Sequence, residues 1–331
     1  MALSKNPSVS PEIPCVEAAG NDSVDILDFV SENMVEIQEA LNEAGSVLLR
    51  GCGARTHESL DGLPELFGGE PLDYKDAATP RSSVSGGVYT STDYPASERI
   101  ELHNEGCYSD SWPGYLYFAC QTAAAGGGGT TVADGRRLLG ALEKSAPELI
   151  ERLREGVTYV RTFHPRLGIA WQDSFGTEDR DEVVASCERR GLRAHWIGED
   201  VLQTKATWPA LTHHPETGEE CWFNQVVAFH PAALPVDLRK VLTRTCGQDM
   251  LPKTVTYADD SPIPDDVVEH VLGEAHKITI PAPWRVGDVM IVDNILSSHG
   301  REPYTGERRV LVSMSHERCW DAVASGVGHG N

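Results

Sequence analysis

The sequence has no cysteines spaced as CxxC and no long apolar run, and no secretory leader is expected from its N-terminus. Its eight cysteines are scattered over 331 residues, so neither a zinc ribbon nor a disulfide framework is expected. The thiols are predicted to stay reduced in a cytoplasmic protein. No apolar stretch reaches the roughly 18 residues of a membrane span, and the N-terminus lacks the hydrophobic segment of a signal peptide.

Positive charge is also scarce. The 28 lysines and arginines stand against 50 acidic residues, which gives a formal net charge of −22. Such a balance argues against nucleic acid as a partner. Carrier proteins are themselves acidic, so docking one would need a local basic patch such as Arg189-Arg190 with Arg193, or Arg136-Arg137. The charge therefore favours a free small-molecule substrate, with a carrier-bound one left open.

A nucleotide-binding loop is missing as well. Glycines 126–129 are not followed by the Gly-Lys-Ser/Thr that completes a phosphate loop. The glycine stretch is instead expected to lead into a strand at 130–132.

Two His-x-Glu triplets are present, at residues 103–105 and 214–216, and about two acidic triplets of this kind are expected by chance. The second lies in a predicted turn, which would hold its side chains less firmly than a strand. Residues two apart on a strand point to one side, as two ligands of one metal must. His103 and Glu105 are therefore candidate ligands. Two imidazoles and one carboxylate can hold non-haem Fe(II) and leave positions open.

The second imidazole is predicted to be His299. Of the 12 histidines it is the one followed by an arginine, Arg309, at a spacing of 10 to 13 residues. A predicted turn at 300–306 brings the two residues to one end of a pocket, and strand alternation would put Arg309 and Ser313 on one face. An arginine suits a dicarboxylate co-substrate because it stays charged and binds carboxylates bidentately.

Further similarity extends over about residues 45–317. The stretches that carry it are 85–92, 102–113, 127–134, 215–225 and 293–303. With the histidine, glutamate and arginine pattern, they resemble the Fe(II)/2-oxoglutarate dioxygenases of the taurine dioxygenase (TauD/TfdA) superfamily. Within it, the chain is most similar to amino-acid hydroxylases of nonribosomal peptide pathways, including aspartyl β-hydroxylases.

The resemblance implies a mainly β fold with helical insertions (α+β). Its core is a double-stranded β-helix, a jelly-roll or cupin-like structure flanked by helices. Residues 1–20 are predicted to be a flexible tail, and residues 21–331 a single dioxygenase domain with a helical insertion around 135–200. The spacing of Met34, Ile37 and Leu41 predicts a helix that ends at Gly45.

The resemblance also implies the cofactors and their residues. His103, Glu105 and His299 would hold Fe(II), and 2-oxoglutarate and O2 would be consumed with succinate and CO2 as co-products. Thr130 would assist Arg309 in binding the distal carboxylate of 2-oxoglutarate. Arg308 would face the opposite side of the strand, at the surface. Glu105 excludes the halogenases of the superfamily, which carry a small residue there.

Substrate-binding candidates are less sharply defined. Trp222 and Asn224 share a strand face and would form a side wall of the pocket. Ser313 lies where sulfonate-degrading relatives carry a second arginine, so sulfonates are not expected as substrates. The arginines considered for a substrate carboxylate are Arg81, Arg161 and Arg318.

The predicted reaction is hydroxylation of an aliphatic carbon in an amino acid or an amino-acid-derived intermediate of specialised metabolism. Desaturation, cyclisation or epoxidation at the same iron site is an alternative. A non-catalytic or Zn-dependent cupin-like protein is a remote one.

Overall fold

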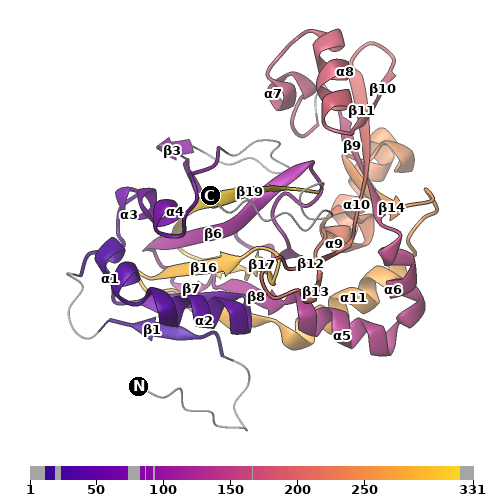
Figure 1. Cartoon of the computed structure of the whole chain (residues 1–331). Helices are drawn as coiled ribbons and strands as arrows, with labels where there is room; N and C mark the ends of the chain where they lie inside the picture. Colours follow the sequence, from indigo (N-terminus) through magenta and orange to yellow (C-terminus); the bar gives the residue numbers. More distant parts are fainter. Residues whose placement is uncertain are drawn as a thin grey trace.

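Two β-sheets face each other across the centre of the molecule (Figure 1). The computed structural model describes residues 12–18, 24–73, 83–85, 87–91, 94–165 and 167–320. The larger sheet contains, in order, β1 (Cys15–Glu17), β2 (Ser46–Arg50), β16 (Val289–Asp293), β6 (Ser111–Thr122), β19 (Arg309–Cys319), β4 (Val88–Thr90) and β3 (Ser83–Ser85). The smaller contains β15 (Ile280–Ala282), β8 (Thr130–Asp134), β17 (Ser297–Arg301) and β5 (Ile100–His103).

Apolar side chains of both sheets fill the space between them. Phe118 of β6 and Val310 and Val312 of β19 pack with Val132 of β8 and Ala282 of β15. These strands are almost continuous apolar runs because side chains on both of their faces are buried. This arrangement confirms the predicted mainly β core.

Short helices cover the outer face of the larger sheet. They are α1 (Ile26–Glu32), α2 (Met34–Ala44), α3 (Glu58–Asp61) and α4 (Leu63–Leu66). Ile37 and Leu41 of α2 pack against Tyr117 and Leu311 of the sheet. The helix predicted from this spacing is confirmed, and it ends at Gly45, whose φ of 71° suits a residue without a side chain.

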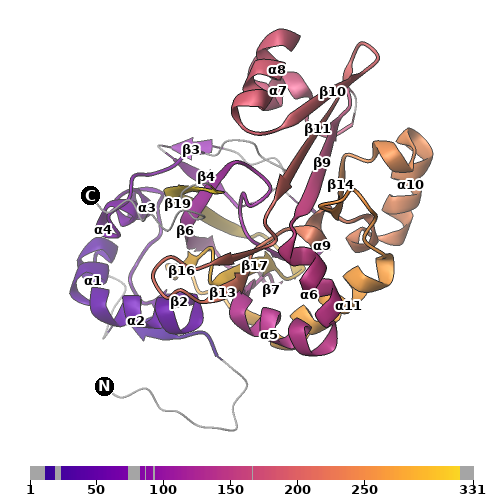
Figure 2. The same ribbon diagram turned by 45° about the vertical axis from the view of Figure 1, so that its right-hand side comes forward.

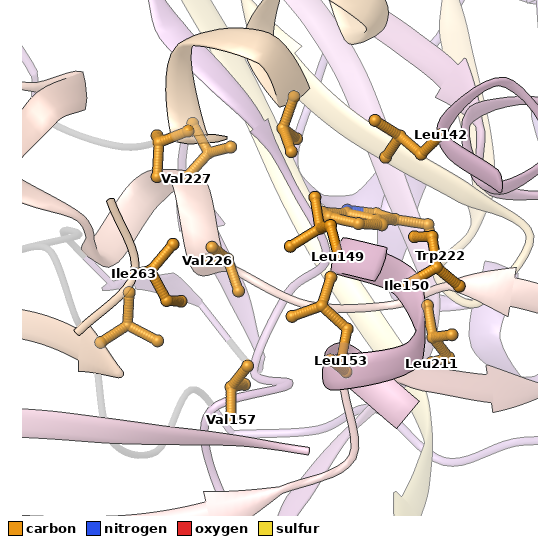
Figure 3. Close-up of a cluster of buried hydrophobic side chains, with 14 of the residues drawn as sticks. Leu142, Leu149, Ile150, Leu153, Val157, Leu211, Trp222, Val226, Val227 and Ile263 are labelled. Carbon is orange, nitrogen blue, oxygen red and sulfur yellow. The ribbon is translucent and has the colours of Figure 1, made fainter. Parts of the chain in front are cut away.

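A second group of helices packs on the outer face of the smaller sheet. It consists of α5 (Gly135–Ser145), α6 (Pro147–Arg154), α9 (Val226–Phe229) and α11 (Asp265–Ile278). Leu142, Leu149 and Leu153 belong to the apolar cluster beneath them (Figure 3). In the described part of the chain, no helix is long and apolar enough to cross a bilayer.

A third sheet projects from this core (Figure 2). It contains β10 (Arg193–Ile197), β11 (Val201–Trp208), β9 (Val157–Phe163) and β14 (Lys253–Tyr257), and α7 (Trp171–Phe175) and α8 (Arg180–Arg189) accompany it. The segment around 135–200 holds the helices α5 to α8 and also the strands β9 and β10. The remaining elements are β7 (Gly126–Gly127), β12 (Leu211–His213), β13 (Glu220–Trp222), β18 (Tyr304–Thr305), α10 (Val236–Cys246) and the 3-10 turns η1 (Pro231–Ala233) and η2 (Gln248–Met250).

The N-terminal segment differs from the flexible tail predicted for residues 1–20. Within it, β1 pairs in parallel with β2, and Val16 is buried. The tail prediction is wrong for this strand, since main-chain pairing orders it. Residues 1–11 and 19–23 lie outside the described residues.

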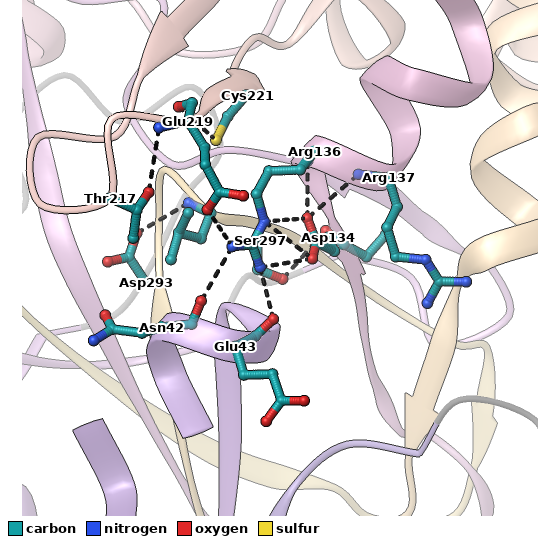
Figure 4. A network of polar contacts seen from close by, with 12 residues as sticks. Asn42, Glu43, Asp134, Arg136, Arg137, Thr217, Glu219, Cys221, Asp293 and Ser297 are labelled. Atoms are coloured by element: carbon teal, nitrogen blue, oxygen red, sulfur yellow. Dashed lines mark hydrogen bonds and ion pairs between the residues drawn. The ribbon is translucent and has the colours of Figure 1, made fainter. Parts of the chain in front are cut away.

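Arg136 joins three parts of the chain (Figure 4). Its guanidinium donates to Asp134, to Glu219 and to the carbonyl oxygens of Asn42 and Glu43. The hydrogen bond to Asp134 is the main reason why its pKa is raised. Arg136 is thus neutralised within the fold, which argues against it as part of a carrier-docking patch.

Cysteine burial leads to a labelling prediction. The described structure has no disulfide, and Cys15 and Cys319 are exposed whereas Cys107 is fully buried. Burial also raises the pKa of Cys52 and Cys221 to about 12, so little thiolate is present near neutral pH. Iodoacetamide is expected to modify Cys15 and Cys319 first, as peptide mass spectrometry would reveal. Equally rapid labelling of Cys107 in the native protein would contradict this packing.

Candidate metal centre

Two histidines and one glutamate from distant parts of the chain meet at one end of the β-core. His103 ends β5 and pairs directly with His299 of the neighbouring β17. The two ring centroids are 4.3 Å apart, and His299 Nε2 lies 3.9 Å from Glu105 Oε2. One potential ligand atom from each residue lies within 4.8 Å of the others. Such a set has the donor types and the spacing to surround a single ion.

The donor atom of His103 is defined by its neighbour. Its Nδ1 lies 2.9 Å from the carbonyl oxygen of Glu101. Because a carbonyl oxygen can only accept, Nδ1 carries the proton and Nε2 keeps the lone pair that a metal needs. The site is also shielded from water, since Glu105 and His299 are each 4% exposed.

Glu105 does not lie on the strand that carries His103. The strand ends at His103, and Glu105 lies in the following turn, so strand alternation was the wrong reason for their shared direction. The turn is possible because Gly106 adopts a φ of 71°, and a side chain there would approach Trp112.

Asn294 fixes this turn, and the sequence analysis did not identify it. Its side chain accepts from the Glu105 N–H at 2.8 Å and donates to the carbonyl oxygens of Glu105 at 2.9 Å and Pro113 at 2.8 Å. Its own carbonyl oxygen accepts from Asn104. Asn294 is completely buried and lies five residues before His299. The available signal was an amide directly after the strand 289–293.

Asn294→Ala is expected to destabilise the protein by about 3 kcal/mol, because three buried main-chain groups would lose a partner. Iron affinity should fall with it, since Glu105 would lose its fixed position. Urea denaturation and an iron titration measure the two effects. If neither the stability to urea nor the iron affinity changed, the turn would keep its conformation without Asn294.

The other His-x-Glu triplet has a structural role. His214 is buried, with Nε2 3.1 Å from Asp293 Oδ2, and its Nδ1 accepts from the Thr217 N–H. Both ring nitrogens are therefore engaged. Glu216 is exposed on the turn, as expected for a pair that holds no metal.

The two adjacent arginines are oriented opposite to the prediction. Arg309 is exposed, whereas Arg308 is half-buried and donates to Gly128 O at 2.8 Å and Ser91 Oγ at 3.1 Å. Burial lowers the pKa of Arg308 to about 10. The reason is that Val310 faces the interior between the sheets, so residue 308 shares that side and residue 309 points away.

Thr130 is buried at the start of β8, beside Arg301 of β17. Its hydroxyl accepts a hydrogen bond from Trp284 Nε1 at 3.1 Å. Arg301 donates hydrogen bonds to the carbonyl oxygens of Tyr94, Pro95 and Glu98. Its guanidinium is therefore stabilised by main-chain groups of the protein.

A pocket of about 280 Å³ adjoins His103 and Glu105. Tyr108, Gln225 and Lys253 contribute polar groups to its lining, and residues 228–230, 233–234, 242 and 251–252 contribute mainly apolar ones. Lys253 was not expected here, since a lone lysine in a strand carries no sequence signal. Burial and the charge of Arg161 lower its pKa to about 8, although Glu105 acts in the opposite direction.

Most of the predicted substrate residues lie elsewhere. Trp222 packs between α5 and α6 (Figure 3), and Asn224 bonds to Ala210 O and the Val226 N–H. The predicted side wall is therefore wrong for both. The residue of that segment that lines the pocket is Gln225.

Ser313 and Arg318 do not line the pocket either. Ser313 follows Leu311 on the helix-covered face of β19, so the exclusion of sulfonates no longer has a basis in this residue. Arg318 packs against Gly114. Arg161 lies next to Lys253 on the paired strand, with Tyr108 and Phe163 nearby. Arg81 lies outside the described residues.

Comparison with known proteins places this geometry in a family. The sequence pattern of the taurine catabolism dioxygenase TauD, TfdA family matches residues 8–315. Dapdiamide synthesis protein DdaC of Enterobacter agglomerans is 35% identical over 308 residues, which cover 93% of this chain and 92% of DdaC. A clavaminate synthase-like protein of Arabidopsis thaliana is 28% identical, with 84% of this chain and 83% of the relative covered.

Solved structures agree on the fold. PvcB of Pseudomonas aeruginosa superimposes with a TM-score of 0.52 at 15% identity, covering 94% of this chain and 88% of PvcB. AAD-2 in complex with Mn(II) and N-oxalylglycine gives 0.51 at 11% identity, covering 94% of this chain and 98% of AAD-2. The chain therefore belongs to the TauD/TfdA family and is an Fe(II)- and 2-oxoglutarate-dependent dioxygenase that uses O2.

Proposed function

We propose that the protein hydroxylates an aliphatic carbon of an amino acid, or of an intermediate derived from one, during synthesis of a specialised metabolite. The observation that carries the proposal is the meeting of His103, Glu105 and His299 beside a pocket with apolar and polar walls. The similarity to a dapdiamide synthesis protein over almost the whole chain supports the metabolic setting.

In this proposal, His103 Nε2, His299 Nε2 and the Glu105 carboxylate hold the iron. The donor set fits the ion, because two neutral imidazoles and one carboxylate suit Fe(II) and cover only part of its coordination sphere. Bound iron supplies the activation of O2 that is coupled to decarboxylation of 2-oxoglutarate. The chain contributes the orientation of the reactants and the exclusion of water.

Arg308, with Thr130, is proposed to bind the distal carboxylate of 2-oxoglutarate in place of Arg309. The Phe118 ring lies 5.4 Å from the His299 ring. Cys120 lies two residues after Phe118 on the same face of β6, about 6.6 Å further along the strand. Cys120 also interacts electrostatically with Arg308. That separation is comparable to the length of a five-carbon dicarboxylate. Among the described residues Arg308 Nη2 makes no hydrogen bond, so it can donate to the carboxylate while the other two nitrogens position the guanidinium.

The test is substrate-dependent succinate formation by the Fe(II)-reconstituted protein under O2. Amino acids are supplied free and attached to a carrier protein, and products are analysed by mass spectrometry with ¹⁸O2. Hydroxylation adds one labelled oxygen to a saturated carbon, whereas desaturation or cyclisation removes two hydrogens and epoxidation consumes a double bond. Absence of iron-dependent succinate formation under all conditions would refute the proposal.

A further inference from the structure

Lys253 places a positive charge in the pocket next to the metal centre. It is the first residue of β14, is half-buried and lines the pocket together with His103 and Glu105. Within the described part of the chain, its ammonium forms no hydrogen bond or salt bridge. Its aromatic neighbour is Phe229, whose ring centroid lies 5.5 Å away.

A second cation reinforces this charge. Arg161 of β9 is the direct cross-strand partner of Lys253, and its charge acts on the lysine unfavourably. Glu105 is the acidic group that acts on Lys253 favourably. With Glu105 bound to a divalent ion, as in the proposed function, its charge is shared with the metal. Lys253 then loses part of this favourable interaction, and its half-buried charge is costly unless a ligand compensates it.

Three other polar side chains of the pocket lining already have partners. Gln225 donates to Asn104 O, and Glu101 is paired with His276 Nε2 at 2.9 Å. The ring nitrogens of His230 contact Ile263 O and the Ala232 N–H, and burial lowers the pKa of His230. Arg99 also lines the pocket, but it is exposed at the surface. Lys253 is thus the charged group available to a ligand inside.

We propose that Lys253, supported by Arg161, binds a carboxylate of the substrate, so that the substrates are amino acids or related aliphatic acids with a free carboxylate. The inference rests on the proposed function and narrows its substrate class. The carboxylate would fix one end of the substrate at β14. The apolar walls would then direct its aliphatic part toward His103 and Glu105, where oxidation takes place. Lys253 is a specificity-determining residue in this scheme.

The experiment compares L-amino acids with their α-carboxamides, and includes the aspartate–asparagine and glutamate–glutamine pairs. Substrate-dependent succinate release is measured for the wild type, Lys253→Met and Lys253→Arg. Acids are expected to exceed their amides in kcat/KM by at least about tenfold, and Lys253→Met should abolish this preference while Lys253→Arg retains part of it. Lys205→Met, which changes a lysine of the same sheet that is paired with Asp260, should behave as wild type.

Two further measurements separate this inference from other roles of Lys253. The KM for 2-oxoglutarate and the uncoupled succinate formation of Lys253→Met should stay within about twofold of wild type, since the lysine does not serve the co-substrate. The Fe(II)-loaded, substrate-free Lys253→Met protein should melt at a higher temperature than loaded wild type, because it lacks a half-buried cation whose acidic neighbour, Glu105, is bound to the metal.

The inference is overturned if amides match their acids, if no acid stimulates succinate release, or if Lys253→Met melts lower. A tenfold rise in the KM for 2-oxoglutarate would assign the lysine to the co-substrate instead. Complete lack of iron-dependent turnover in the wild type would refute the proposed function, and the melting comparison would still report on Lys253.

Discussion

His299→Ala is expected to reduce succinate formation by about 1,000-fold or more, equivalent to about 4 kcal/mol of transition-state stabilisation. The reason is that one of three protein ligands would be lost from a site with no spare donor: in the described part of the chain, the set of His103, Glu105 and His299 is the one group that can surround an ion. Iron content per chain should fall in parallel. Succinate formation and metal analysis after anaerobic reconstitution measure both quantities.

Two other histidines provide controls. His270 is exposed on α11, where it contacts Ser145, and His270→Ala should match wild type. His214 belongs to the second His-x-Glu triplet and is bonded to Asp293. His214→Ala should unfold more easily but retain iron in its folded fraction. If folded His214→Ala lost its iron while His299→Ala kept a normal iron content, the metal ligand would be His214 and not His299.

Arg308→Ala is expected to raise the KM for 2-oxoglutarate by about 100-fold, the equivalent of about 3 kcal/mol for a charge-assisted hydrogen bond from a half-buried guanidinium. The half-buried guanidinium is positioned by Gly128 O and Ser91 Oγ, and it lies on the interior side of the strand that begins at residue 309. Initial rates at varied 2-oxoglutarate give the KM and separate it from kcat.

Arg309→Ala is the matched control because it removes the same charge from the next position. Arg309 is exposed, so the KM for 2-oxoglutarate should change by less than about threefold. If Arg309→Ala raised the KM for 2-oxoglutarate strongly and Arg308→Ala left it unchanged, Arg309 would be the co-substrate ligand, as the sequence pattern predicts. Equal effects of both would indicate general electrostatic attraction of the dianion.

The difference between the two arginines shows where sequence reasoning fails. Sequence reasoning predicted the strand around residues 310–312 and the turn before it, but assigned residue 309 to the wrong face of that strand. Val310, Leu311 and Val312 are all buried, because one face of β19 meets the other sheet and its opposite face meets the N-terminal helices. With apolar residues on both faces, periodicity cannot tell inside from outside. The register shift between β19 and β6 at Arg309 makes the orientation of this residue still harder to predict.

The metal centre was easier to predict than the pocket. Its histidines and glutamate are rare residue types at a defined spacing, and they remain informative although Glu105 lies on a turn. The pocket is formed by segments such as 225–234 and 251–253, which surround the cavity only through tertiary packing. Trp222 and Asn224 shared a predicted face, but the helices α5 and α6 cover Trp222 and a turn engages Asn224. No motif or residue spacing in the sequence identifies Lys253 as a pocket residue.

The direct pairing of His103 with His299 has a consequence for how the ion is acquired. The two residues are neighbours in a main-chain ladder, so folding alone brings their rings together and the cation finds its donors already arranged. The conformational entropy of gathering distant ligands is lost when the sheets form and does not weaken the affinity for iron. Small zinc domains behave in the opposite way, because there the ion itself drives the chain into shape. Here the empty scaffold can persist, and loading and release become reversible events on a folded polypeptide.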